Sequence, residues 1–440
     1  MKRTLLYVFL AVVAFSSCKK EEDSVFDKSP DQRINETMDQ YQRILAGASH
    51  GWKALVYPSG APNSVFSFYF KFNESNRVVM FSDWDSTSAV TPKESSYRLK
   101  ALQQPSLLFD TYSYLHLLSD PDASVNGGVN GEGLNADFEF AIDTAYTDTL
   151  KLIGRFHGTK VTLVKATQQE ADNYFNKKYS ERLINNLGKY LTYFKRLTVG
   201  SKIYDVAVNP VARTITFTWV DSNGNMKRFT TGFYYTVNGI AFAKPFADGN
   251  QVINGFSNMT WDAATTTLSF SVNSENATIK ETNQPLYVDK TAPGRWWQTA
   301  VNYGAYWYSP LGFHVNGKND AFGISSVTAS GGFPYYYLIY FPGYQSPFDL
   351  LAPVFVNTTL NQLTLSYGSG ASKPTFTTDG KAIFKELGTL GTYPTSGPAA
   401  STRAQLYDSG GYYLVQTGEK TYDMVSVTDG KIWINWYPVW

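Results

Sequence analysis

Oxygen-bearing side chains are concentrated around a glycine- and asparagine-rich stretch at residues 121–133. Asp120 and Asp122 flank Pro121, and Asn126 follows shortly after. Because Ca²⁺ prefers carboxylate and amide oxygens, Asp120, Asp122 and Asn126 are candidate calcium ligands. Their spacing matches no EF-hand, however, and the same residue types are typical of turns. Turn formation is the favoured interpretation, calcium is the alternative, and no other cofactor is indicated.

The usual mark of a zinc hydrolase is missing from the sequence. The histidines show no HExxH spacing. Asp83 and Asp85 flank Trp84 and would share one face of a strand, where two carboxylates could act on a glycosidic bond. An exposed loop with a packed tryptophan is the favoured alternative. A hydrolase with an unrecognised carboxylate site, built within residues 110–137 together with His116, remains a second hypothesis.

Aromatic residues make up 16% of the chain and form several groups after residue 290. Flat exposed rings can stack on sugars, whereas buried rings stabilise a β-rich core. In a strand, consecutive side chains face opposite sides, so the run Tyr335 to Tyr337 cannot lie entirely in the core. Core packing is favoured for most rings. The candidate ligand-binding residues are Trp296, Trp297, Tyr306, Trp307, Tyr336 and Trp433.

The first 17 residues resemble the signal peptide of a bacterial lipoprotein. Lys2 and Arg3 form a basic start, and residues 5–15 form an apolar run too short to span a bilayer as a mature helix. Cys18, the only cysteine, comes next after two serines. The resemblance implies that Cys18 is lipidated and holds the protein in the outer-membrane lipid. An ordinary secretory signal with a chance cysteine is the alternative.

Residues 18–28 are predicted to form an acylated tether. The charged stretch from Lys19 to Asp23 cannot bury and should stay solvated. It resembles the export signals that follow the lipidated cysteine in surface lipoproteins of Bacteroidota. The resemblance implies a lipid-anchored protein of the cell outer membrane that faces the outside.

The composition excludes one class of partner. Charged residues are 17% of the chain, below the usual value of about 25%, and the formal net charge is +1. Nucleic-acid binding needs a basic face, so no nucleic-acid partner is expected. With the single cysteine assigned to lipid, no disulfide is available to the mature chain, and its stability must come from packing.

The pattern predicts a mainly β protein. Ser29, Pro30 and Gln32 predict a helix start with a capping box, and Gly47 is a plausible end. From residue 52 to residue 165 the hydrophobic period becomes two, which indicates a curved antiparallel sheet or barrel after the helix. The predicted parts are a helix-plus-β domain (29–166), a helical connector (167–197), a middle β domain (198–290) and a C-terminal aromatic-rich β domain (291–440), the last two comprising one or two β-sandwich-like domains.

Several strings together resemble a known family. They are FDKSPDQRINETMDQYQ, GWKALVYP, FYFKFNESNRVVMFSD, SSYRLKALQQPSLLFDTYSYLHLLSDPD and DTLKLIGRFHGTKVTL. They are similar to domain of unknown function 4302, a family of Bacteroidota lipoproteins, and the similarity is densest over residues 26–166. The resemblance implies a place beside outer-membrane importers of the SusC/SusD kind and transfers no catalytic residue.

Together these observations favour a non-catalytic function. The expectation is a surface lipoprotein that binds a nutrient, either a glycan or a peptide, or that serves as an accessory subunit of a SusC/SusD-like uptake system. A purely structural importer subunit and the hydrolase described above are the alternatives.

Overall fold

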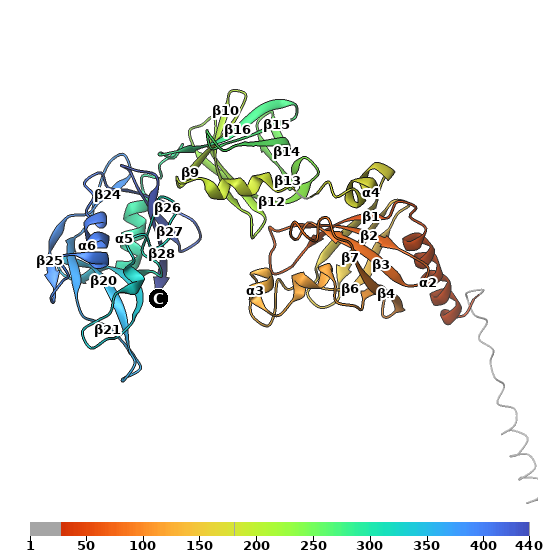
Figure 1. The fold of residues 1–440 in the computed structure, drawn as a ribbon, viewed down its shortest axis with the longest axis horizontal. Coiled ribbons are helices and arrows are strands. Elements are labelled where there is room, and N and C mark those ends of the chain that lie inside the picture. The colour runs from red at the N-terminus through yellow and green to blue at the C-terminus, as the bar shows by residue number, and fades with distance from the viewer. Residues whose placement is uncertain (1–27, 180, 440) are drawn as a thin grey trace, which may run out of the picture. The chain divides into compact units, whose positions relative to one another are not determined.

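The computed structural model describes residues 28–179 and 181–439 (Figure 1). The predicted signal peptide, Cys18 and nearly all of the predicted tether therefore lie outside the described residues. Within the described part of the chain, no helix is both long and apolar enough to cross a membrane.

The described residues divide into two compact units. The first holds the described residues up to Gly60, together with Phe68–Ser82 and Thr91–Phe175. The second holds Ala61–Ser67, Asp83–Val90 and the described residues from Asn176 onward. Two short early segments thus belong to the unit that contains the later strands.

The first helix of the described chain, α2 (Pro30–Ala46), begins where the sequence predicts. The Ser29 side chain accepts a hydrogen bond from the Gln32 N–H at 3.2 Å, and the Gln32 side chain accepts one from the Ser29 N–H at 3.1 Å. This reciprocal capping box satisfies two amides that have no partner inside the helix. Gly47 follows as the C-cap, so the predicted helix is confirmed.

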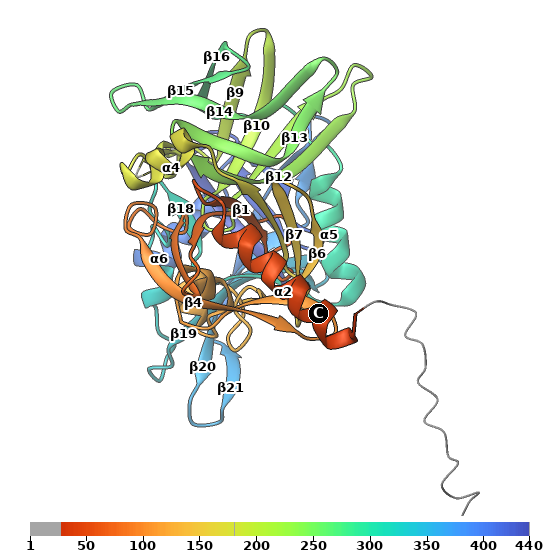
Figure 2. The same cartoon turned by 90° about the vertical axis from the view of Figure 1, so that its right-hand side faces the viewer.

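Eight antiparallel strands, which belong to the first unit except for Phe66 and Ser67 at the start of β2, close into a barrel in sequence order. Closure joins β8 to β1, with registers running from Trp52 opposite Lys165 to Tyr57 opposite Lys160. Helix α2 lies over β4 (Figure 2). The elements are β1 (Trp52–Tyr57), β2 (Phe66–Phe72), β3 (Arg77–Ser82), β4 (Lys93–Ala101), β5 (Pro105–Phe109), η1 (Tyr114–Ser119), α3 (Ala123–Asn126), β6 (Glu139–Ala145), β7 (Thr149–Gly154) and β8 (Lys160–Lys165).

Side-chain alternation explains why this barrel has a filled interior. Phe68, Phe70 and Phe72 follow one another on one face of β2, with ring centroids 5.6 Å and 5.9 Å apart. All three are nearly fully buried. On the opposite face of β2, Tyr69 packs against Tyr174, which lies in helix α4 (Gln168–Phe175), with ring centroids 4.9 Å apart. The strand is therefore buried on both faces.

The predicted connector at 167–197 is only partly helical. Helix α4 ends at Phe175, and a 3₁₀ helix, η2 (Leu183–Lys189), follows. Strand β9 already begins at Phe194, so the C-terminal end predicted for the helical connector is wrong. Phe194 and Leu197 satisfy a helical spacing, but in the strand they lie on opposite faces: Leu197 joins the core of the second barrel, and Phe194 packs with Tyr413 and Val425.

The middle β domain is a second closed barrel of eight antiparallel strands, not a sandwich. Strand β9 pairs with both β10 and β16, which closes the sheet. The interior is filled largely by aromatic and branched side chains, including Phe217 and Phe246, whose rings stack 4.2 Å apart. The strands are β9 (Phe194–Val199), β10 (Lys202–Asn209), β11 (Thr214–Val220), β12 (Met226–Thr236), β13 (Gly239–Asp248), β14 (Gln251–Asp262), β15 (Thr267–Val272) and β16 (Glu275–Thr282).

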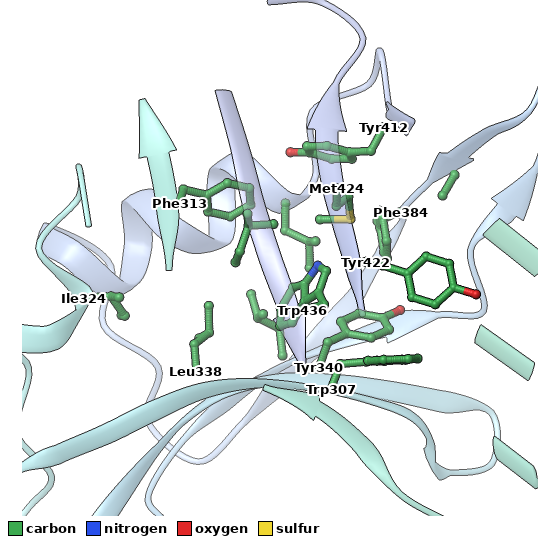
Figure 3. Packing of buried hydrophobic residues seen from close by; sticks show 14 of the residues in the cluster. Trp307, Phe313, Ile324, Leu338, Tyr340, Phe384, Tyr412, Tyr422, Met424 and Trp436 are labelled. Atoms are coloured by element: carbon green, nitrogen blue, oxygen red, sulfur yellow. The ribbon is translucent and has the colours of Figure 1, made fainter. Parts of the chain in front are cut away.

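The last part of the chain forms a 12-stranded sheet with two main helices. The pairing of β17 with β28 joins two arms of this sheet, and side chains from both arms share one core with the helices (Figure 3). Its elements are α5 (Ala292–Tyr303), β17 (Tyr306–Ser309), β18 (Phe313–Val315), η3 (Ile324–Ser326), β19 (Tyr335–Gln345), β20 (Phe348–Asn357), β21 (Gln362–Leu365), β22 (Gly368–Ser372), β23 (Thr375–Phe376), β24 (Lys381–Ile383), β25 (Glu386–Leu390), α6 (Gly397–Leu406), β26 (Tyr412–Gln416), β27 (Tyr422–Ser426) and β28 (Ile432–Val439).

The predicted fold class is confirmed. The protein is mainly β, with curved and barrel-like antiparallel sheets and few helices.

Candidate functional site

The candidate calcium loop uses its oxygens to build turns. Asp120 Oδ1 accepts from the Asp122 N–H at 3.0 Å, and its other oxygen accepts from the Tyr112 hydroxyl. Asp122 caps α3 through the Ser124 N–H at 2.8 Å, and that hydrogen bonding lowers the Asp122 pKa. Asn126 is buried and bonds to the backbone through both its amide nitrogen and its oxygen. These contacts match the turn interpretation.

No group of three or more His, Cys, Asp or Glu side chains suited to a metal ion occurs among the described residues. The three candidate calcium ligands include only two carboxylates. Their geometry therefore adds nothing to the calcium alternative, which stays a sequence prediction.

The acidic residues near His116 are held by separate partners. Asp110 forms a bidentate ion pair with Arg98, both distances being 2.6 Å. Asp137 is buried and accepts backbone N–H groups of the 156–159 turn. His116 Nδ1 accepts from the Ser113 N–H at 3.2 Å, Nε2 lies 3.2 Å from the Phe109 carbonyl, and burial lowers the His116 pKa. His116 thus bonds to the backbone, and each acid bonds to other partners, so the described residues show no acid–base pair there to support the hydrolase hypothesis.

Asp83 and Asp85 also have unrelated environments. Asp83 is 3% exposed and forms an ion pair with Arg213, equally buried, at 2.7 Å. Asp85 is exposed and accepts from the Ser88 N–H at 2.6 Å in a local turn. The Trp84 ring stacks on Phe66 with centroids 5.4 Å apart. The two carboxylates thus serve a buried ion pair and a turn, and the packed-tryptophan interpretation describes the site better than an acid–base pair.

Two of the candidate ligand-binding tryptophans are core residues. Trp296 and Trp307 are both 0% exposed, and their rings stack 5.9 Å apart. The Trp296 ring also stacks on Tyr340, which lies beside Trp307 in the core (Figure 3). They face the core because α5 and β17 turn those positions toward the shared hydrophobic interior. Neither ring can reach a ligand without unpacking the domain, so their assignment to ligand binding is corrected.

Trp297 and Trp433 are half-buried, and other side chains of the protein already contact their rings. The Trp297 indole N–H donates to Asp349 at 2.7 Å, and the Lys373 ammonium lies 4.0 Å from the ring centroid. Trp433 stacks on His314 with centroids 3.6 Å apart. One ring face of each tryptophan is covered, which leaves them poorly placed to stack on a sugar.

Tyr306 and Tyr336 lie on an aromatic surface. On β17, Tyr306 and Tyr308 point away from the core that holds Trp307. Tyr337 lies on the same face, and its hydroxyl lies 2.9 Å from that of Tyr306. Tyr437 of β28 stands directly opposite Tyr308, with ring centroids 5.5 Å apart. We call the set Tyr306, Tyr308, Tyr336, Tyr337 and Tyr437 the tyrosine face.

A register shift in β19 creates this surface. The pairing with β20 slips between Tyr335 and Tyr337, so one extra residue is inserted there. Tyr335 therefore packs against the main core, whereas Tyr337 faces the opposite side and Tyr336 stays 54% exposed. The Tyr336 ring lies 4.7 Å from the Tyr337 ring. The bulge thus places three consecutive tyrosines in three different environments.

The tyrosine face combines one ring that is fixed by packing, Tyr337, with two exposed rings, Tyr336 and Tyr437. Tyr337 is 9% exposed and packs with Ile339 and Val354, and burial raises its pKa, so its hydroxyl stays protonated. Tyr336 and Tyr437 are 54% and 38% exposed. Rings fixed on one side and open on the other lose little side-chain entropy when they bind a flat ligand. Tyr308, Tyr337 and Tyr437 were missing from the predicted site, because the strand register that unites them is not visible in the sequence.

Comparison with models of known protein families identifies the family of this chain. Residues 22–263 match the family model described as "Domain of unknown function (DUF4302)", which is more than half of the chain. The chain belongs to this family. The resemblance predicted from sequence is thereby confirmed for the family itself. A comparison with curated protein sequences found no match.

One solved structure that the chain resembles shows a weak likeness. An alignment with a DNA polymerase III subunit beta sliding clamp from Bartonella birtlesii covers 92% of this DUF4302 chain and 98% of that chain. The sequence identity is 8% and the TM-score is 0.15. A TM-score this low carries no argument about fold or function.

The DUF4302 match and the tyrosine face occupy different parts of the chain. The matched residues contain all of the first barrel and the second barrel as far as β14. The tyrosine face lies on β17, β19 and β28, beyond the match. Membership of the family therefore gives no information about the tyrosine face, whose chemistry depends on its own residues.

Proposed function

We propose that this protein is a lipid-anchored outer-membrane protein, exposed on the cell surface, that binds a glycan without catalysis and works beside a SusC/SusD-like importer. The observation that supports a glycan as the ligand is the tyrosine face. Aromatic rings offer apolar faces for the C–H surfaces of sugars, and tyrosine hydroxyls offer hydrogen bonds at the rim. The lipid anchor and the importer rest on the sequence resemblance alone.

Binding by the tyrosine face predicts a clear mutational result. We expect Tyr336→Ala to weaken glycan binding roughly tenfold, because truncating one exposed aromatic anchor commonly costs about 1–2 kcal/mol. Stability should change by less than about 0.5 kcal/mol, since the ring is largely exposed. A glycan array followed by calorimetric titration of the strongest ligand would measure this.

Tyr146→Ala is the matched control, because Tyr146 is 61% exposed and lies in the first unit. It should leave the affinity unchanged. Glycan binding that survives the double replacement of Tyr336 and Tyr437 by alanine would contradict the proposed site. A face that binds only an importer subunit, and no glycan, would contradict the proposed ligand and favour a structural role.

The anchor is tested through Cys18. We expect the natural chain to carry fatty acid and to require detergent for extraction, and Cys18→Ser to abolish both properties. Metabolic labelling with a tritiated fatty acid and intact mass measurement would detect the lipid. Protease treatment of whole cells should degrade the anchored protein if it faces outward. An unlabelled wild-type chain would refute the anchor and leave the glycan test unaffected.

A further inference from the structure

The second unit contains a cavity of about 410 Å³ that none of the candidate residues predicted from sequence lines. One wall is the outer surface of the second barrel, formed by β9 to β12. The other is the end of β26 with the turn after it and the segment at residues 285–289. Sites for small molecules commonly measure about 300–1,000 Å³. The cavity therefore has room for a ligand about the size of a sugar.

Strand register arranges polar side chains in a row across the barrel wall. Arg196 stands opposite Asp205, Asp205 opposite Thr218, and Thr218 opposite Arg228. Asp205, Thr218 and Arg228 all line the cavity. Four neighbouring strands thus present a carboxylate, a hydroxyl and guanidinium groups at one level of the wall, an arrangement set by the backbone pairing.

Both carboxylates in the lining are already neutralised. Asp205 forms an ion pair with Arg196 at 2.7 Å and also accepts from the Leu286 N–H. Asp289 forms an ion pair with Arg295 at 2.7 Å. Because each acid has its own arginine outside the lining, neither is left to balance the cations that face the cavity.

Two cations line the cavity and form no ion pair within 4 Å in the described chain, although Glu281 stands opposite Lys195 on β16. Lys195 Nζ lies 3.3 Å and 3.4 Å from the backbone carbonyl oxygens of Tyr193 and Thr192. Arg228 donates to the Gln416 carbonyl at 3.1 Å. Burial lowers the Lys195 pKa, and the nearby Glu281 opposes that shift. Glu281 is itself held by the backbone N–H groups of residues 191 and 192. Arg228 is therefore the cation of the lining that no ion pair or opposing acid of the described chain balances, and Lys195 adds a positive charge that Glu281 offsets in part.

The remaining lining suits a hydroxylated organic molecule better than a bare ion. Phe194, Leu414 and Val415 are apolar, and the Tyr193 and Tyr287 rings add flat surfaces. Thr216 and Thr218 contribute hydroxyl groups. An inorganic anion would leave this apolar area unused, whereas a sugar ring can cover it.

We propose that this cavity binds a small organic carboxylate of the sugar-acid class, with the carboxylate held by Lys195 and Arg228 and the ring lying against the apolar wall. The guanidinium of Arg228 can hold a carboxylate through two parallel hydrogen bonds, and the Lys195 ammonium adds a second charge. This site is separate from the tyrosine face, so the inference goes beyond the proposed function and does not depend on it.

Calorimetric titration of the full mature chain with D-glucuronate and D-glucose tests the proposal. The two probes differ mainly by the carboxylate. We expect glucuronate to bind at least tenfold more tightly than glucose, and more weakly as salt is raised, because screening reduces the attraction between charges. Arg228→Met should weaken glucuronate binding at least tenfold. Arg228 is exposed, so this variant should fold normally.

Lys195→Met is expected to have a similar effect, with a thermal melt confirming that the variant is folded. Lys227→Met is the matched control, because Lys227 is the exposed neighbour of Arg228 on β12 and lies outside the lining. The Tyr336→Ala variant should bind glucuronate normally, which separates this site from the tyrosine face. Equal affinity for glucose and glucuronate, unchanged binding by Arg228→Met, or binding of inorganic phosphate alone would each overturn the proposal.

Discussion

Replacing Asp83 by alanine is expected to lower the free energy of unfolding by about 3–5 kcal/mol, the cost of breaking a buried ion pair. The Asp83 carboxylate accepts from Arg213 at 2.7 Å, from the Ser67 N–H at 2.9 Å and from the Tyr235 N–H at 3.0 Å. Its loss would leave the Arg213 guanidinium, only 3% exposed, without a counter-charge. All of these residues belong to the second unit.

A second arginine increases the expected loss. Arg182 donates to the Asp83 carbonyl at 2.8 Å and lies over the Tyr235 ring, and burial next to Arg213 lowers its pKa. Two neighbouring guanidinium groups, that of Arg213 buried and that of Arg182 half-buried, therefore lie beside a single carboxylate, to which only Arg213 bonds. Without it they repel each other in a medium that screens charge weakly.

Urea unfolding, followed by tryptophan fluorescence and far-ultraviolet circular dichroism, would measure the effect. Asp148→Ala is the control, since Asp148 pairs with Lys165 at 3.3 Å and its side chain is 71% exposed. That substitution should cost no more than about 1 kcal/mol. Replacing Asp83 and Arg213 together by Leu and Met should cost less than Asp83→Ala alone. A loss below about 1 kcal/mol for Asp83→Ala would show that the pair is not held as described.

Replacing Trp296 by alanine is the second change with a large expected effect. We expect a loss of about 3–5 kcal/mol in the free energy of unfolding, the range for removing a large buried aromatic side chain. Trp296 is 0% exposed, and its ring lies 5.1 Å from Tyr340, 5.9 Å from Trp307 and 6.2 Å from Trp436. Because Trp296 joins α5 to both arms of the sheet, the cavity left behind could not close without moving several rings.

Trp296→Phe should be milder. The Trp296 indole N–H has no hydrogen-bond partner among the described residues, so phenylalanine would lose volume but no polar contact. Denaturant midpoints of the two variants would give the comparison. Glycan affinity measured on folded Trp296→Phe should match that of the natural chain, whereas a ligand-stacking role for Trp296 would lower it. This outcome separates a core residue from a binding residue.

Local sequence determined much of the first unit. Ser29, Pro30 and Gln32 were enough to predict α2, because a capping box involves residues only three positions apart. The strand-rich stretch was also readable: Arg77–Ser82, Thr149–Gly154 and Lys160–Lys165 lie within residues 52–165, where a period of two was predicted. Such patterns depend on neighbours along the chain, so no distant partner is needed to recognise them.

Tertiary structure decided which faces and partners those elements have. Closure of the second barrel depends on β9 pairing with β16, whose residues are some 80 positions apart (Ala277 opposite Val199, for example), and alternation alone does not separate a barrel from a sandwich. The ion pair of Asp83 with Arg213 spans 130 positions and left no local signal. By contrast, Asp83 and Asp85 are close enough in sequence to be noticed as a pair, although their surroundings in the structure are unrelated.

The aromatic residues show the same division most clearly. Composition and spacing indicated that the last part of the chain is rich in rings and that they could not all be buried. Which rings are exposed depended on one inserted residue at Tyr336 and on the pairing of β17 with β28. A one-residue slip reverses every later side chain in a strand, so the tyrosine face exists only once the register is set. The sequence by itself determined a β-rich, aromatic-rich protein, and the strand pairing decided which of its aromatic rings a ligand can reach.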